Sequence, residues 1–102
     1  MTHRDVFVVS TARTAIGTFG GSLKDVPNTQ LATTAVKAAI QRAGIAPDAV
    51  GHVVMGNVIP TDTKDAYLSR VAAIDAGCPI ETPAFNVNRL CGSGLQAIIS
   101  AA

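Results

Sequence analysis

Three short β-favouring runs alternate along the chain with three segments of helical periodicity, and this alternation restricts the possible folds more than any other feature. The runs cover residues 6–9, 52–58 and 84–87. The order β-α-β-α-β-α predicts a layered α/β domain with a mostly parallel sheet and right-handed crossovers. Residues 6–9 are apolar at every position, which is typical of a strand covered on both faces.

The predicted helices have apolar stripes, and two of them have glycine stop signals. The first begins at Asn28 or Thr29, either of which can act as N-cap, and ends before Gly44. The second extends from about residue 64 to 76 and ends before Gly77. Residues 10–28 are polar and glycine-rich, which predicts a long irregular connection.

The third predicted helix, residues 95–102, is apolar on nearly every side and shows no stop signal before Ala102. A helix of this kind needs cover all around it, and 102 residues are fewer than the roughly 150 expected of an average domain. We therefore expect residues 1–102 to be the N-terminal part of a larger domain, with no second domain.

Charge and hydropathy exclude several classes of partner. Eight Lys and Arg residues against seven Asp and Glu give a net charge of +1 without a basic or acidic block, which argues against nucleic acid and anionic membranes as partners. Uninterrupted apolar runs are far shorter than the roughly 20 residues of a spanning helix or the core of a secretory signal. We expect a cytoplasmic protein. Its two cysteines, Cys78 and Cys91, are too few for a disulfide framework.

Cys91 is the candidate for chemistry, because it lies between a predicted strand and the first turn of a predicted helix. Free backbone N–H groups and the helix dipole favour an anion there, either a thiolate or an oxyanion. Gly92 and Gly94 remove side chains that would block a substrate. A covalent acyl transfer needs both a thiolate and oxyanion donors. The alternative is a small buried cysteine with no chemical role.

Ten residues around Cys91, with the sequence NRLCGSGLQA (residues 88–97), resemble the nucleophile segment of thiolases, the acetyl-CoA acetyltransferases. The opening VVSTARTAIGTFGG (residues 8–21) resembles the N-terminal block of that family. VMGNV (residues 54–58) and SRVAA (residues 69–73) match its second strand and second helix in order. The similarity covers the whole chain and is greatest to bacterial β-ketothiolases that feed polyhydroxyalkanoate synthesis.

The resemblance implies a thiolase fold and a ping-pong reaction in which Cys91 becomes acylated. Its backbone N–H would belong to the oxyanion hole, and Gly92 and Gly94 would allow close approach of the substrate. The enolate of a second acetyl-CoA then attacks the acyl group to give a 3-ketoacyl-CoA, and degradation of fatty acids uses the reverse thiolysis. No metal or prosthetic group is implied, coenzyme A arrives as part of the substrate, and the full-length enzyme is expected to be a homodimer or homotetramer.

The family's other catalytic groups have no match in these residues. Neither a Gly-His-Pro segment nor a second cysteine in a glycine-rich segment is present, and His3, His52 and Cys78 do not fit those motifs. The loop domain that binds coenzyme A is also missing. We expect the segment alone to be inactive and to supply only the nucleophile. A non-catalytic fragment that folds or dimerises with another chain is the alternative, and a decarboxylating ketoacyl synthase is a third possibility.

Overall fold

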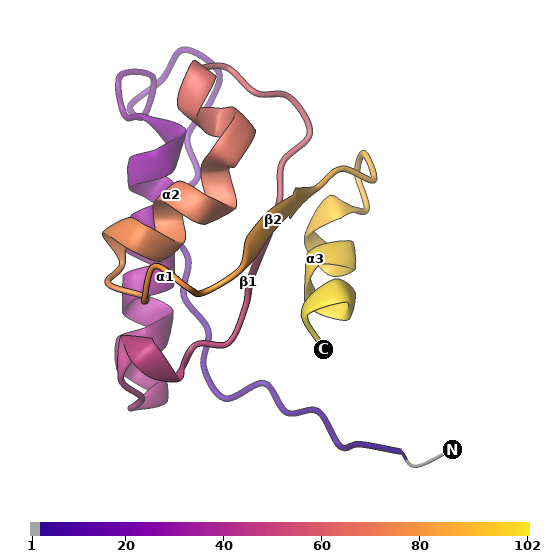
Figure 1. Cartoon of the computed structure of the whole chain (residues 1–102). Helices are drawn as coiled ribbons and strands as arrows, with labels where there is room; N and C mark the ends of the chain where they lie inside the picture. The colour runs from indigo at the N-terminus through magenta and orange to yellow at the C-terminus, as the bar shows by residue number, and fades with distance from the viewer. Residues whose placement is uncertain (1–2) are drawn as a thin grey trace.

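The computed structural model describes residues 3–102, which form three layers (Figure 1). Helices α1 and α2 lie on one side of a two-stranded sheet, and α3 lies on the other side. The elements are α1 (Asn28–Ala43), η1 (Pro47–Ala49), β1 (Val53–Gly56), η2 (Thr63–Tyr67), α2 (Leu68–Asp75), β2 (Ala84–Val87) and α3 (Ser93–Ala101). This arrangement confirms the predicted α/β class.

The two strands are parallel, as the alternating order predicts. Their register runs from Val53 opposite Ala84 to Gly56 opposite Val87. Helix α2 makes the crossover between them, so both strands end at the same edge of the sheet. The segments that follow β1 and β2 therefore emerge side by side, and one of them leads to Cys91.

Residues 6–9, predicted as the first strand, form no strand in this structure. They are extended, but their side chains are 61–77% exposed. An apolar run is not sufficient for a strand, because ladder hydrogen bonds require a neighbouring strand about 4.8 Å away. Within residues 3–102 no such neighbour lies beside this segment. Residues on either side of it join it to the body instead: the hydroxyl of Ser10 donates to the carbonyl of Ala39 in α1 at 2.7 Å, and the guanidinium of Arg4 donates to the carbonyl of Ala102 at 3.2 Å.

Helix α1 has the predicted bounds but a different N-terminal cap. Gly44 ends it in the left-handed conformation, with φ of 69°, as expected of a C-terminal glycine. At the other end Pro27 occupies the N-cap position, and no side chain caps the first turn. Asn28 is already the first residue of the helix, and its side-chain nitrogen donates to the side chains of Thr61 and Asp65.

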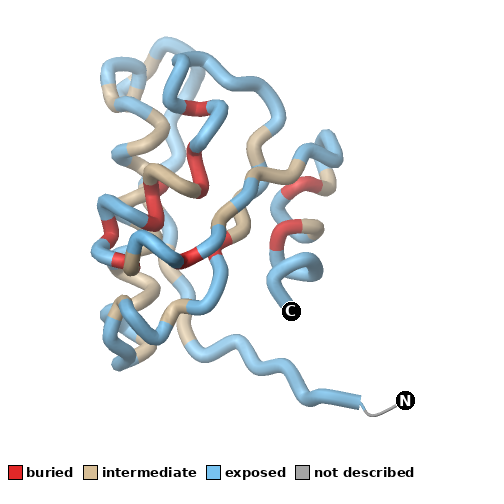
Figure 2. The backbone as a smooth tube through the Cα atoms, in the orientation of Figure 1, coloured by how far each residue is buried: buried red, intermediate tan, exposed pale blue. Residues whose placement is uncertain are grey.

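The core lies between the sheet and the pair α1 and α2 (Figure 2). Ala72 and Ala73 of α2 are completely buried there, and Met55 of β1 packs against both groups of core residues. The other buried apolar side chains of this layer are Ala32, Val53, Leu68 and Cys78. Small residues at these positions allow α2 to approach both the strands and α1 closely.

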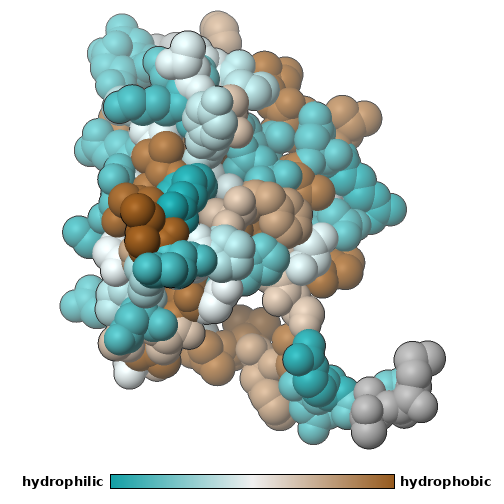
Figure 3. All heavy atoms as spheres, in the orientation of Figure 1, coloured by the Kyte–Doolittle hydropathy of each residue, from teal (hydrophilic) through white to brown (hydrophobic). Residues whose placement is uncertain are grey.

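Helix α3 packs on the opposite face through a narrow strip that contains Ser93 and Ala97. Its larger apolar side chains point elsewhere, so Leu95, Ile98 and Ile99 are 56–65% exposed. Figure 3 shows hydrophobic residues among hydrophilic ones on the visible face of the molecule. None of the helices found in residues 3–102 combines the length and apolar character needed to span a membrane.

Candidate active site

Cys91 lies at the edge of the sheet where β1 and β2 end, two residues before α3 begins. Its side chain is exposed and its thiol is free. This is the strand-to-helix junction that the sequence predicts. Within residues 3–102 Cys91 is exposed rather than buried.

A tight turn precedes Cys91 and contains a strained residue. Leu90 has a φ of 47°, a left-handed conformation that costs a non-glycine residue about 1 kcal/mol or more. The turn is closed by two backbone hydrogen bonds, from the amide of Gly92 to the carbonyl of Arg89 at 3.0 Å and from the amide of Ser93 to that of Leu90 at 3.1 Å. Strain of this kind is found where a fold fixes the direction of a functional group.

One backbone N–H group beside the thiol, that of Cys91 itself, is available to an anion. Within residues 3–102 the amide of Cys91 donates no hydrogen bond, although the amides on either side of it do. The first turn of α3 follows at once and adds the positive end of its dipole. Gly94 has open space where a side chain would be, and Gly92 forms the N-cap. The arrangement suits an attacking sulfur beside a developing oxyanion.

The end of β1 presses directly against the start of α3. A Cβ atom on Gly56 would lie 2.8 Å from the carbonyl carbon of Ser93 and 3.0 Å from the amide nitrogen of Gly94. Only glycine permits this approach, which sets the height of the α3 N-terminus above the sheet. Sequence reasoning did not single out Gly56, although a glycine inside a strand can signal close backbone approach.

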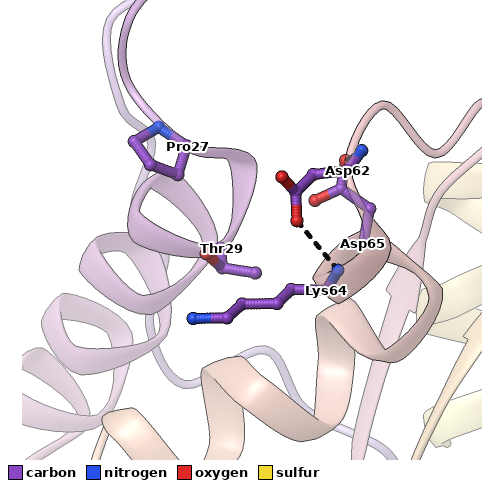
Figure 4. Close-up of a pocket in the computed structure, with 5 residues that line it drawn as sticks. All are labelled: Pro27, Thr29, Asp62, Lys64 and Asp65. Carbon is purple, nitrogen blue, oxygen red and sulfur yellow. Dashed lines mark hydrogen bonds between the residues drawn. The ribbon is translucent and has the colours of Figure 1, made fainter.

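A second polar centre lies between the start of α1 and η2. Oδ2 of Asp65 accepts hydrogen bonds from the amide and hydroxyl of Thr61, the amide of Asp62 and the side chain of Asn28, at 2.8–3.0 Å. These bonds, led by that of the Thr61 amide, lower the pKa of Asp65. The adjoining cavity of about 180 Å³ is shown in Figure 4 and is lined by Pro27, Thr29, Asp62, Lys64 and Asp65.

This polar centre holds the chain together rather than offering a reactive group. Asp65 is 1% exposed, and its backbone carbonyl accepts from the side chains of Asn57, which follows β1, and Asn86 in β2. The side-chain oxygen of Asn86 accepts from the amide of Ser69 at 2.9 Å. The loop after β1 is therefore tied to both strands, and sequence reasoning did not identify this network.

The structure places the remaining candidate side chains away from Cys91. Cys78 is buried in the core on the far side of the sheet, and burial raises the pKa of its thiol. The ring of His52 packs against that of Phe85, with centroids 5.1 Å apart. His3 is exposed in the N-terminal segment. No hydrogen bond joins either histidine to Cys91 within the described part of the chain.

Residues 6–102 match the family model described as the N-terminal domain of thiolase. The chain is 62% identical over 99 residues to the β-ketothiolase BktB of Cupriavidus necator, which covers 97% of this chain. It is 45% identical over 97 residues to the human mitochondrial 3-ketoacyl-CoA thiolase, which covers 95% of it. The chain spans about a quarter of the length of these relatives, 25% and 24% respectively.

Solved structures show the same backbone. A crystal structure of human mitochondrial 3-ketoacyl-CoA thiolase in complex with CoA superposes with a TM-score of 0.89 at 45% identity, covering 92% of this chain and 24% of that one. The acetyl-CoA acetyltransferase of Bacillus anthracis gives a TM-score of 0.85 at 39% identity, with the same coverage of both chains.

Proposed function

This chain belongs to the thiolase family, and from that premise we propose that it supplies the nucleophile of an acyl-CoA acyltransferase, with Cys91 as the acyl-accepting residue. The observation that carries the proposal is the geometry at Cys91. An exposed thiol stands at the start of a helix, next to a backbone amide that donates no hydrogen bond within residues 3–102. Gly94 leaves room for a bulky thioester on this side, whereas a Cβ atom on Gly92 would lie 3.4–3.9 Å from atoms of Arg89.

The proposed reaction begins with attack of the Cys91 thiolate on the carbonyl carbon of an acyl-CoA thioester. A carbon–sulfur bond forms to Cys91 and the carbonyl oxygen becomes negatively charged. The amide N–H of Cys91 donates to that oxygen, as expected of an oxyanion-hole group. When the carbonyl re-forms, the bond to the coenzyme A sulfur breaks, the coenzyme A thiolate leaves, and Cys91 carries the acyl group.

The second half-reaction forms or cleaves a carbon–carbon bond. The enolate of a second acetyl-CoA attacks the acyl carbon, releases the Cys91 thiolate and gives a 3-ketoacyl-CoA. The reverse sequence is thiolysis by coenzyme A. Both directions require acid–base groups near Cys91, and the histidines and second cysteine of the described segment lie elsewhere. We assign those groups to other parts of the complete enzyme, which is about four times as long in the relatives.

Finer properties of the complete enzyme form part of the same proposal. The names of the relatives support acyl-CoA and acetyl-CoA as substrates, with coenzyme A entering only as part of them. The similarity to a bacterial β-ketothiolase supports a role in fatty acid metabolism or polyhydroxyalkanoate synthesis. We propose a cytoplasmic homodimer or homotetramer that uses no metal, and the two free cysteines accord with a reducing compartment.

A pair of cysteine variants tests the proposal in the complete protein. We expect Cys91→Ser to abolish acetoacetyl-CoA thiolysis, because a hydroxyl is a much weaker nucleophile than a thiolate. Cys78→Ala is the matched control, since Cys78 is buried on the other side of the sheet and should not affect the reaction. Circular dichroism would check that both variants fold. Thiolysis at the wild-type rate by Cys91→Ser would remove Cys91 from the mechanism.

A further inference from the structure

Leu90 has an unfavourable backbone conformation that its own exposed side chain does little to stabilise. Within residues 3–102 it is the only non-glycine residue with a positive φ, and it directly precedes Cys91. Its side chain is 69% exposed, so packing contributes little to holding the unfavourable backbone conformation. Other groups must therefore maintain the left-handed turn, and with it the direction in which the Cys91 sulfur and amide point.

Asn88 is the first of these groups. Its side-chain oxygen accepts from the amide of Leu90 at 3.0 Å, which is the two-residue step of an Asx turn. Its side-chain nitrogen donates to the carbonyl of Val58 at 3.3 Å. Val58 lies just beyond the end of β1, whereas Asn88 directly follows β2. One side chain thus anchors the strained turn to the exit of the neighbouring strand.

Ser93 is the second group and acts from the other side of the turn. Its hydroxyl donates to the carbonyl of Leu90 at 2.6 Å and accepts from the amide of Arg89 at 2.8 Å. Ser93 is buried and packs close to Gly56 at the end of β1. The amide and the carbonyl of Leu90 are therefore both held by polar side chains, one from each end of the turn.

We propose that Asn88 is a positioning residue that, together with Ser93, holds Leu90 in the left-handed conformation and thereby fixes the Cys91 sulfur and amide relative to the acyl group. The inference rests on the proposed function of Cys91. Asn88 touches no reacting atom and acts through the backbone of Leu90. Loss of the Asn88 side chain should therefore lower the rate of Cys91 acylation, because the geometry of attack matters most in the transition state.

The test measures single-turnover acylation of Cys91 by acetyl-CoA in the complete protein. We expect Asn88→Ala to lower the maximal acylation rate about a hundredfold, the effect of misplacing a reacting group by about 1 Å, and to leave the acetyl-CoA concentration for half-maximal rate nearly unchanged. Asn88→Ser keeps a neutral acceptor for the Leu90 amide, so its rate should lie closer to wild type. If Asn88→Ala does not fold, the test rests on Asn88→Ser, whose smaller loss of rate should be recovered when Leu90→Gly is added.

Two further variants separate positioning from general stability. Asn57→Ala removes an asparagine at the same edge of the sheet, whose side chain donates to the carbonyl of Asp65 at 3.0 Å and not to the turn. It should lower stability without reducing the acylation rate. Leu90→Gly removes the cost of the positive φ, so Asn88→Ala in that background should recover much of its lost rate.

The outcomes distinguish this inference from the proposal beneath it. If wild-type protein is not acylated, the proposed function fails and the inference fails with it. If wild type is acylated and Asn88→Ala reacts at the same rate, or if Asn88→Ser reacts as slowly as Asn88→Ala, Asn88 has no positioning role. Equal losses in Asn57→Ala and Asn88→Ala, with no recovery from Leu90→Gly, would also overturn the inference, because both changes would then act through stability alone.

Discussion

Replacing Gly56 with alanine should disturb both stability and catalysis, because no space exists for a methyl group there. The new Cβ would lie 2.8 Å from the carbonyl carbon of Ser93 and 2.9 Å from its oxygen, whereas ordinary contacts begin at 3.4 Å. These are backbone atoms, so the start of α3 must move away from β1 by about 0.6 Å, the difference between the two distances. Overpacking of this kind costs about 1–3 kcal/mol.

The same displacement moves the segment that carries Cys91, so we expect the acylation rate to fall about tenfold or more. Urea unfolding followed by circular dichroism measures the stability change, and rapid-quench acylation with acetyl-CoA measures the rate. Gly51→Ala is the matched control, because nothing lies within 4 Å of its added Cβ. If Gly56→Ala matched Gly51→Ala in both measurements, the close contact between β1 and α3 would not set the position of Cys91.

Three other perturbations follow from the same contacts. Gly44→Ala should destabilise the protein by about 1 kcal/mol through its φ of 69° alone, since the space around it is open, and urea unfolding would show it. The pKa of Asp65 is lowered in the folded state, so its stabilising effect is present above about pH 4 and is lost as the pH falls through the folded pKa. Asp65→Asn should therefore have a lower melting temperature than wild type at pH 7, and this difference should become smaller in acid. A difference that does not change with pH would contradict a stabilising role for the Asp65 carboxylate. Iodoacetamide at neutral pH should modify Cys91 before Cys78, because Cys78 is buried with a raised thiol pKa, and peptide mass spectrometry reports the order.

Local patterns in the sequence predicted most of the layered arrangement. The bounds of α1 and β2 follow from apolar periodicity and from the Gly44 stop, and these signals depend only on nearby residues. The prediction of a strand at residues 6–9 was wrong, because a strand there needs a neighbouring strand to pair with, and no local sequence pattern reveals whether one is present. The predicted N-cap of α1 was also wrong. Asn28 lies inside the helix, and its side chain bonds to Asp65, which is far along the chain.

The candidate site divides in the same way. The position of Cys91 between a strand and a helix was predictable, because both elements have clear sequence signals. Asn88 and Gly56 were not assigned roles from the sequence, because the contacts of Asn88 with Val58 and of Gly56 with the start of α3 exist only when β1, β2 and α3 are assembled. Ser93 was not assigned a role either, although its hydroxyl bonds to Arg89 and Leu90 close by in the sequence. Their residue types are common in turns and strands, so type alone does not distinguish a support of the site from an ordinary surface position.

The most direct test of the central claim is to trap the acyl-enzyme. The complete protein is mixed with acetyl-CoA, quenched in acid within milliseconds, digested and analysed by peptide mass spectrometry. We expect an acetyl group on the peptide that contains Cys91, removable by hydroxylamine, and none on the peptide that contains Cys78. An acetyl group elsewhere, or turnover without any modification of Cys91, would contradict the assignment of Cys91 as the nucleophile.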